Sequence, residues 1–165
     1  MQAWHDYYQM IGGAAATLLG LLFVSVTVRA EKIFGAGQEH SRRLAEQAFQ
    51  NYLAVLMISL VALFSDLTIP TFGYIIMGAT LAWGFWVVIR ATFALSTPSV
   101  HEPRLRMFRR YIASLIGFAM LTYSGAKMAT GDGFPGNTLA VALLVLVVSA
   151  TTVSWELLIA VAKEK

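Results

Sequence analysis

The chain alternates between long apolar runs and short polar connectors, and the runs are long enough to cross a lipid bilayer. A membrane-spanning helix needs about 20 mostly apolar residues, because the hydrocarbon core is about 30 Å thick. Because lipid cannot bond to backbone N–H and C=O groups, each span should be an α-helix. The pattern predicts an all-α polytopic membrane protein whose residues 1–165 form a single integral membrane domain. We predict five transmembrane helices, at residues 8–28, 48–67, 72–95, 111–129 and 138–162.

The connectors refine this outline. The stretch SRRLAEQAFQNY (41–52) is typical of a helix that begins in water and enters the bilayer. The stretch 30–40, which contains two glycines, is expected to form a flexible joint before that helix. The stretches 65–70 and 131–136 are short and contain proline or glycine, which favour turns. We therefore expect the helices on either side of each turn to be antiparallel neighbours.

Composition supports a lipid-facing exterior. Hydrophobic residues make up 58% of the chain and charged residues 13%, whereas a soluble domain carries about a quarter charged residues. The net charge is +3, but the charges lie in the connectors, which indicates membrane orientation and not nucleic-acid binding. The chain has no cysteine, so disulfides and thiolate metal sites are excluded.

The basic residues predict how the chain is oriented. All of the Lys and Arg residues except Lys127 lie in the connectors 29–47 and 96–110, at Arg90 or at the C-terminus. By the positive-inside rule, the N-terminus should be outside and the C-terminus cytoplasmic. No basic residue precedes the first apolar run, so we expect that run to be an N-out anchor and not a cleavable signal peptide.

The N-terminal residues carry one resemblance. Trp4, Tyr7 and Tyr8, followed by the run GGAAATLLGLLFV (12–24), resemble the start of small, largely uncharacterised bacterial multi-span membrane proteins. The resemblance covers only this N-terminal part of the chain. It implies a protein integral to the bacterial cytoplasmic (inner) membrane, and it carries over no catalytic residues.

Small residues recur in the predicted spans. Gly12, Ala16 and Gly20 are spaced by four residues in the first span, Gly78 lies in the third and Gly117 in the fourth. Small residues let a neighbouring helix approach closely. They could pack helices within one bundle, or they could pack copies of the first span around a symmetry axis and line a pore. Because five helices enclose few positions fully, a homo-oligomer is expected in both cases.

Glu156 is the acidic residue well inside a predicted span, whereas Asp66 lies at the end of another. At 1.5 Å per residue it lies about 27 Å from the outer end of the fifth span. Arg90 in the third span has a similar depth, and Arg29 closes the first span near the same level. Ionisable residues in a membrane usually have a named partner and a role. We therefore predict an ion pair between Glu156 and one of these arginines in the inner leaflet.

Two alternatives remain for Glu156. Ser149, Thr152 and Glu156 fall on one helix face, so they could line a polar path for a solute. Glu156 could also extend its carboxylate to the interface on its own. Against a polar path, hydroxyls in membrane helices commonly bond to the carbonyl four residues earlier in their own helix.

Acidic residues mark the predicted outer side, where Asp6, Asp66 and Asp132 are found. Carboxylates arranged around a symmetry axis would form an acidic mouth that concentrates cations. Asp66 and Asp132 also adjoin turns, where aspartate commonly forms local hydrogen bonds.

The most basic stretch is the predicted cytoplasmic loop 99–110, with Arg104, Arg106, Arg109 and Arg110. Such a loop is attracted to anionic lipid head groups and could also bind another subunit, or it could serve only to fix the topology.

Enzymatic activity is not expected. His5, His40 and His101 lie in flanks or loops, so no span supplies a histidine ligand for a buried haem. The sequence contains no GxSxG, HExxH, Walker A or GxGxxG motif, and we predict no metal and no cofactor.

Two functions therefore remain as hypotheses. The first is a homo-oligomeric channel or small transporter that conducts a solute such as a cation. The second is a non-conducting accessory or scaffold subunit of a larger membrane complex. A channel needs a continuous path across the membrane, whereas an accessory subunit needs only faces on which other helices pack.

Overall fold

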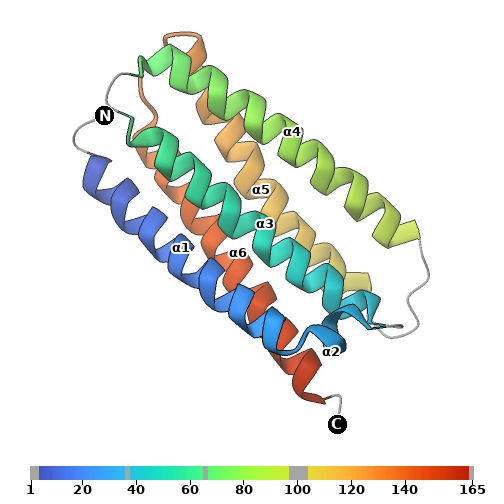
Figure 1. Cartoon of the computed structure of the whole chain (residues 1–165). Coiled ribbons are helices and arrows are strands. Elements are labelled where there is room, and N and C mark those ends of the chain that lie inside the picture. The colour runs from blue at the N-terminus through green and yellow to red at the C-terminus, as the bar shows by residue number, and fades with distance from the viewer. Residues whose placement is uncertain (1–3, 36–37, 65–66, 97–103, 164–165) are drawn as a thin grey trace. The chain divides into compact units, whose positions relative to one another are not determined.

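The computed structural model describes residues 4–35, 38–64, 67–96 and 104–163, although some side chains near the helix ends lie outside the description. The secondary structure of this part is helical throughout (Figure 1). Five of its six helices, all except α2, are long and apolar enough to cross a membrane, which confirms the all-α class and the number of candidate spans. The helices are α1 (His5–Val28), α2 (Ala30–Phe34), α3 (Glu39–Ala62), α4 (Ile69–Ser96), α5 (Arg104–Ala129) and α6 (Gly136–Lys163).

The second apolar helix differs most from its predicted range of 48–67. It begins at Glu39, as the pattern of residues 41–52 indicates, but it ends at Ala62. The next helix begins at Ile69, where the Thr68 hydroxyl accepts a hydrogen bond from the Thr71 N–H at 3.4 Å. This N-cap fixes the start of α4 three residues before the predicted position, so the apolar residues after Ala62 belong to the connection.

The predicted joint at residues 30–40 is partly helical. Residues 30–34 form α2 directly after α1, and the side chain of Ile33 is 2% exposed. Burial of this apolar side chain explains why the segment is ordered despite the glycines that follow it.

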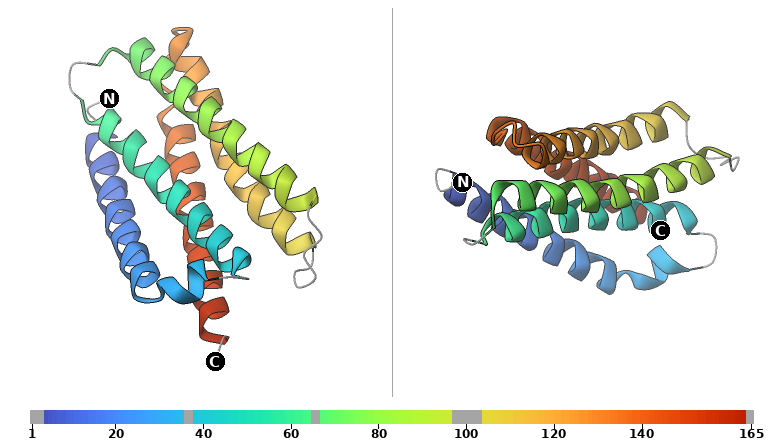
Figure 2. Two further views of the ribbon diagram at one scale, coloured as in Figure 1. Left: turned by 45° about the vertical axis from the view of Figure 1, so that its right-hand side comes forward. Right: turned by 90° about the horizontal axis from the view of Figure 1, so that it is seen from above.

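The contacts divide the chain into two compact units. Residues 64–146 form the first, here called the α4–α5 unit. Residues 2–63 and 147–165 form the second, here called the α1–α3 unit. Helix α6 contributes its first part to the α4–α5 unit and its second part to the α1–α3 unit. The paired helices α4 and α5 lie side by side, and so do α1 and α3 (Figures 1 and 2). The single membrane domain that the sequence suggests stays a prediction.

Two glycines bring α4 and α5 into backbone contact. A Cβ atom added to Gly73 would lie 2.5 Å from the backbone N of Ala129 and 2.7 Å from the backbone O of Gly125. A Cβ added to Gly125 would lie 2.8 Å from the backbone N of Met77. Because backbone atoms cannot swing aside as a side chain does, each position admits only glycine at this spacing.

Further along the same pair of helices, the contact between α4 and α5 becomes polar. The Thr80 hydroxyl on α4 lies 3.0 Å from the Thr122 hydroxyl on α5, within hydrogen-bond distance. Each hydroxyl has one proton, so when one of them donates across to the other helix, the accepting hydroxyl donates to a carbonyl of its own helix. On another face of α5, Gly117 packs against the side chain of Leu146 on α6. Small or hydroxyl-bearing residues therefore set the helix spacing throughout this unit.

The turn between α5 and α6 uses glycine for a different reason. Gly131 and Gly133 have φ angles of +82° and +93°, in the left-handed region that other residues rarely adopt. Both lie in the stretch 131–136, where the sequence predicts a tight turn.

The α1–α3 unit is held by an apolar core that helices α1, α2, α3 and α6 share. Near the start of α1, Gly12 packs against Ser59 of α3. A Cβ added to Gly12 would lie 2.9 Å from the Ser59 Cβ, which is too close for an ordinary contact. The larger cluster begins almost three turns further along α1, at Leu22. Its buried members are Leu22, Ile33, Leu44, Ala45, Ala48, Tyr52, Ala150, Val153, Leu157 and Val161.

The close approach of α4 and α5 can be tested with a matched pair of glycines. We expect Gly73→Ala to destabilise the purified protein by about 1–3 kcal/mol, because the added methyl group meets backbone atoms. The control is Gly78→Ala on the same helix, where nothing lies within 4 Å of an added Cβ. Gly78→Ala should leave stability unchanged or raise it by up to about 1 kcal/mol through helix propensity. Thermal unfolding in detergent measures both, and equal melting temperatures for the two variants would contradict the contact.

Candidate functional site

Two hydrogen bonds connect α3 with α6 inside the α1–α3 unit. The Asn51 Nδ2 donates to the Ser149 Oγ at 3.3 Å, and the Tyr52 hydroxyl lies 3.0 Å from the Thr151 Oγ1. Asn51 and Tyr52 are each 1% exposed, and Ser149 is 6% exposed. The buried polar groups of Asn51, Tyr52 and Ser149 therefore each have a partner, which avoids the cost of an unsatisfied group, and Thr151 itself is exposed. We call these four residues the α3–α6 polar seam.

The direction of the second bond follows from proton counting. The Thr151 hydroxyl has one proton, and it donates to the Val147 carbonyl at 2.8 Å. The Tyr52 hydroxyl is therefore the donor to Thr151. The buried ring of Tyr52 thus carries its polar end across to α6, while its apolar part lies in the core of the unit.

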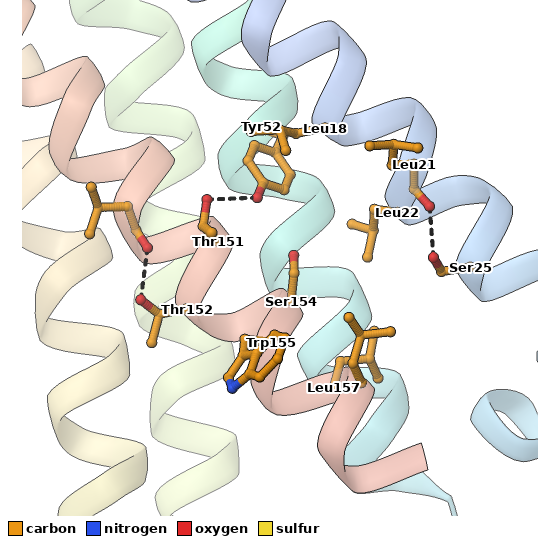
Figure 3. Close-up of a pocket in the computed structure, with 12 residues that line it drawn as sticks. Leu18, Leu21, Leu22, Ser25, Tyr52, Thr151, Thr152, Ser154, Trp155 and Leu157 are labelled. Atoms are coloured by element: carbon orange, nitrogen blue, oxygen red, sulfur yellow. Dashed lines mark hydrogen bonds between the residues drawn. The ribbon is translucent and has the colours of Figure 1, made fainter. Parts of the chain in front are cut away.

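Next to the seam, α1 and α6 border a groove of about 560 Å³, with Tyr52 of α3 among its lining residues (Figure 3). The groove is open to the outside, since Leu21 is 60% and Trp155 65% exposed. We call it the α1–α6 groove. From α1 it is lined by Leu18, Leu21, Leu22 and Ser25, and from α6 by Val148, Thr151, Thr152, Ser154, Trp155, Leu157 and Leu158.

The hydroxyl groups of the groove are already engaged. Ser25 and Thr152 each donate to the carbonyl four residues earlier, at 2.8–2.9 Å (Figure 3). Ser154 donates to the carbonyl of Ala150 at 2.9 Å. Thr151 and Tyr52 are donors as well, as described above. No hydroxyl proton in the lining is left to donate to a ligand, and the lining contains no carboxylate, histidine, lysine or arginine. The groove therefore suits an apolar occupant.

The polar stripe predicted on α6 is divided between these environments. Ser149 is buried in the polar seam, whereas Thr152 is exposed in the groove and bonds to its own helix. Glu156 is half-buried one turn further on. The stripe is therefore not a uniform row of polar groups facing one space.

The two predicted partners of Glu156, Arg29 and Arg90, belong to different units of the chain. Arg29 is exposed just after α1, and within the described residues no ion pair joins it to Glu156. Arg90 belongs to α4 in the other unit, and its side chain lies outside the description. A pair between Glu156 and Arg90 stays a prediction.

The predicted small residues fall into two groups. Gly12 and Gly117 pack against neighbouring helices, as described above. Ala16, Gly20 and Gly78 are exposed, and nothing in the described structure lies within 4 Å of a Cβ built on either glycine. Gly13 is exposed in the same way, so Gly13, Ala16 and Gly20 form a small-residue face on α1 that points away from α3.

The remaining predicted charged residues are the three outer aspartates and the four arginines of the basic loop. Asp6 is exposed, 3.6 Å from the Nδ1 of His5. Asp132 accepts a hydrogen bond from Thr130 at 3.4 Å, which is the local turn bonding that the sequence suggests as one alternative. Asp66 lies outside the described residues. The arginines of the basic loop, Arg104, Arg106, Arg109 and Arg110, lie in the first turns of α5, and their side chains are outside the description.

Several structurally important residues escape prediction. Asn51 and Tyr52 belong to a stretch whose polar residues are equally typical of a helix in water. Their signal is the spacing of the buried apolar residues around them, Leu44, Ala48 and Val55, which continues the same helix face. Gly73 has no small-residue repeat around it, so nothing in its own helix distinguishes it from the exposed Gly78.

No family model, curated protein or solved structure matches the chain. Among the described residues, no group of three or more histidines or acidic residues is placed to hold a metal ion. The polar seam, the groove and the exposed faces are therefore the features of the described structure that bear on function.

A double-mutant cycle can measure the bond between Tyr52 and Thr151. We expect Tyr52→Phe and Thr151→Val together to show a coupling of about 0.6 kcal/mol, the average for hydrogen bonds between membrane helices. The matched control is Thr152→Val, which removes a similar hydroxyl that bonds only to its own helix. Unfolding in detergent provides the free energies. Equal coupling of Tyr52→Phe with both threonine variants would show that no specific bond exists.

Proposed function

We propose that the protein is integral to the bacterial cytoplasmic membrane, with five spans, an outer N-terminus and a cytoplasmic C-terminus. The five apolar helices support membrane insertion, and the exposed large hydrophobic side chains along them support contact with lipid. The orientation rests on the distribution of Lys and Arg residues between the connectors.

Within that membrane, we propose that the protein acts as a non-conducting accessory or scaffold subunit. The observation that carries this proposal is the use of polar groups on α6. Ser149 and Thr151 bond to Asn51 and Tyr52 of α3, and Thr152 and Ser154 bond to carbonyls of their own helix, so these groups are engaged within the protein. A conducting path would require polar groups that face a common space.

The small-residue face of α1 is the candidate docking surface of such a subunit. Gly13, Ala16 and Gly20 are three and four residues apart, so they share one side of the helix. Another transmembrane helix could approach this side closely, whereas lipid chains gain little from it. The partner in the proposal is a helix of another membrane subunit, and a second copy of the chain is the alternative.

A homo-oligomeric channel or small transporter is the second candidate. The observation that favours it is that Thr152 and Glu156, one turn apart on α6, both remain at least partly exposed. Copies of the chain around an axis could bring such groups, or the small-residue face, to a central path for a cation.

Ion flux separates the two functions. We expect liposomes that contain the purified protein to show no cation flux above protein-free liposomes, because the polar groups of α6 are bonded internally. Glu156→Gln should then leave flux at this background. Reconstitution is verified by flotation, and an ionophore added at the end shows that the vesicles are sealed. Flux in the wild type that Glu156→Gln abolishes would reject the accessory role and establish the channel.

Helix association tests the docking face. We expect Ala16→Leu to raise the apparent dissociation constant for the partner helix about fivefold or more, because an inserted side chain in a tight contact costs about 1 kcal/mol or more. The control is Ala14→Leu, which adds the same bulk at another exposed position of α1. Co-purification after mild solubilisation and single-molecule counting of subunits measure binding to other proteins and to copies of the chain. If both variants behave as the wild type, this face is in contact with lipid alone.

A further inference from the structure

A charged hollow lies at the end of α1, beyond the part of the helix that lines the α1–α6 groove. Ser25 lines the groove, and Arg29 follows it by four residues, so both lie on the same side of the chain as α1 ends. Arg29 and Glu31 line a separate hollow of about 440 Å³ formed by residues 27–31. An apolar groove is thus followed by a small polar hollow that contains one cation and one anion.

Both charges of the hollow are available to a ligand. Arg29 and Glu31 are exposed, and neither forms an ion pair with any residue in the described ranges. The nearby charges of α3 behave differently, because Arg42 is paired with Glu46 at 3.0 Å and Arg43 with Glu39 at 3.5 Å. The hollow therefore complements a head group that carries a phosphate and a compact ammonium group.

The groove and the hollow together have the length of one leaflet. From Leu18 to Arg29 the chain advances eleven residues, which is about 16 Å at the rise of an α-helix. Half of the hydrocarbon core is about 15 Å thick. A lipid whose head group lies at Arg29 would therefore place its acyl chain along Leu18, Leu21 and Ser25 and end near the middle of the bilayer. The engaged hydroxyls of the groove are compatible with an acyl chain, since no donor is left without a partner.

We propose that the groove and hollow bind a phospholipid with an ethanolamine head group from the cytoplasmic leaflet. The acyl chain occupies the α1–α6 groove, the phosphate binds the Arg29 guanidinium, and the ammonium group donates to the Glu31 carboxylate. Trp155 lines the same groove and is 65% exposed. The inference rests on the membrane placement proposed above, and it is independent of whether the protein conducts ions.

Native mass spectrometry of the detergent-solubilised full chain tests the site. The protein is titrated with phosphatidylethanolamine, phosphatidylcholine and phosphatidylglycerol of identical acyl chains. We expect the ethanolamine lipid to be retained best, because choline cannot donate a hydrogen bond and glycerol carries no cation for Glu31. Arg29→Gln and Glu31→Gln should each lower its retention about two- to fivefold, as expected for exposed charge pairs. Arg29→Lys should keep most of it.

Matched variants separate the site from general charge and bulk effects. Arg42→Gln and Glu46→Gln remove the same charges from α3 and should retain lipid as the wild type does. Ser25→Phe, which fills the groove, should lower retention of all three lipids, whereas Thr17→Phe on the exposed side of α1 should not. Free phosphoethanolamine should not displace the lipid, because it lacks the acyl chain. Circular dichroism and gel filtration verify that each variant is folded.

Three results would overturn the inference: no preference for the ethanolamine lipid, equal losses for the α3 controls, or a change in oligomeric state with Ser25→Phe while lipid retention is unchanged. The last result would assign the groove to a second copy of the chain. Washing membranes with alkaline carbonate tests the placement separately. A chain released by the wash would reject the membrane placement, whereas an embedded chain without lipid preference would reject the lipid site alone.

Discussion

A polar group within a helix that is long and apolar enough to cross a membrane needs its hydrogen-bond partner inside the protein, and this constraint explains most of the structure. Backbone groups meet it by forming helices. The hydroxyls of Thr151, Thr152 and Ser154 meet it by bonding to carbonyls one turn earlier. At Asn51 and Ser149, the helices α3 and α6 share a bond between them. The need to satisfy polar groups thus also selects which helices become neighbours.

The buried hydroxyls of Tyr8, Ser59 and Ser124 do not follow this rule, since none has a partner among the described residues. Each is a local cost that the surrounding contacts must offset. Ser59 shows how this can occur, because its side chain is the one that Gly12 approaches most closely. Small residues appear on both sides of that contact, and the gain is the dispersion energy of two helices at short distance. The α4–α5 unit extends the same principle to backbone contact at Gly73 and Gly125.

The sequence was sufficient for the helices but not for their faces. Length and apolarity predict five helices, because both properties belong to a single segment. The faces depend on partners that are distant in sequence. Gly12, Ala16 and Gly20 are equally spaced, but four residues turn an α-helix by 400°, so the row drifts by 40° per step. Gly12 therefore faces α3 while Gly20 points outward, and only the position of α3 decides where the row leaves the contact. For the same reason, Asn51 could not be recognised as buried, since Ser149, its partner, lies 98 residues away.

The groove follows from these same contacts. Helix α1 packs on α3 at Gly12, and α6 is bonded to α3 at Asn51 and Tyr52. Contacts with α3 therefore position both α1 and α6. Between them, Tyr52 reaches across to α6 and lines the gap that their separate attachment leaves. An occupant of the groove would therefore contact the two helices without competing for the bonds that hold them. Its effect would be concentrated near the end of α1, where the chain turns into α2 and Arg29 and Glu31 line the adjoining hollow. An apolar chain that fills the groove would stabilise the spacing of α1 and α6, and it would do so without disturbing the small-residue face through which α1 is proposed to bind a neighbouring helix.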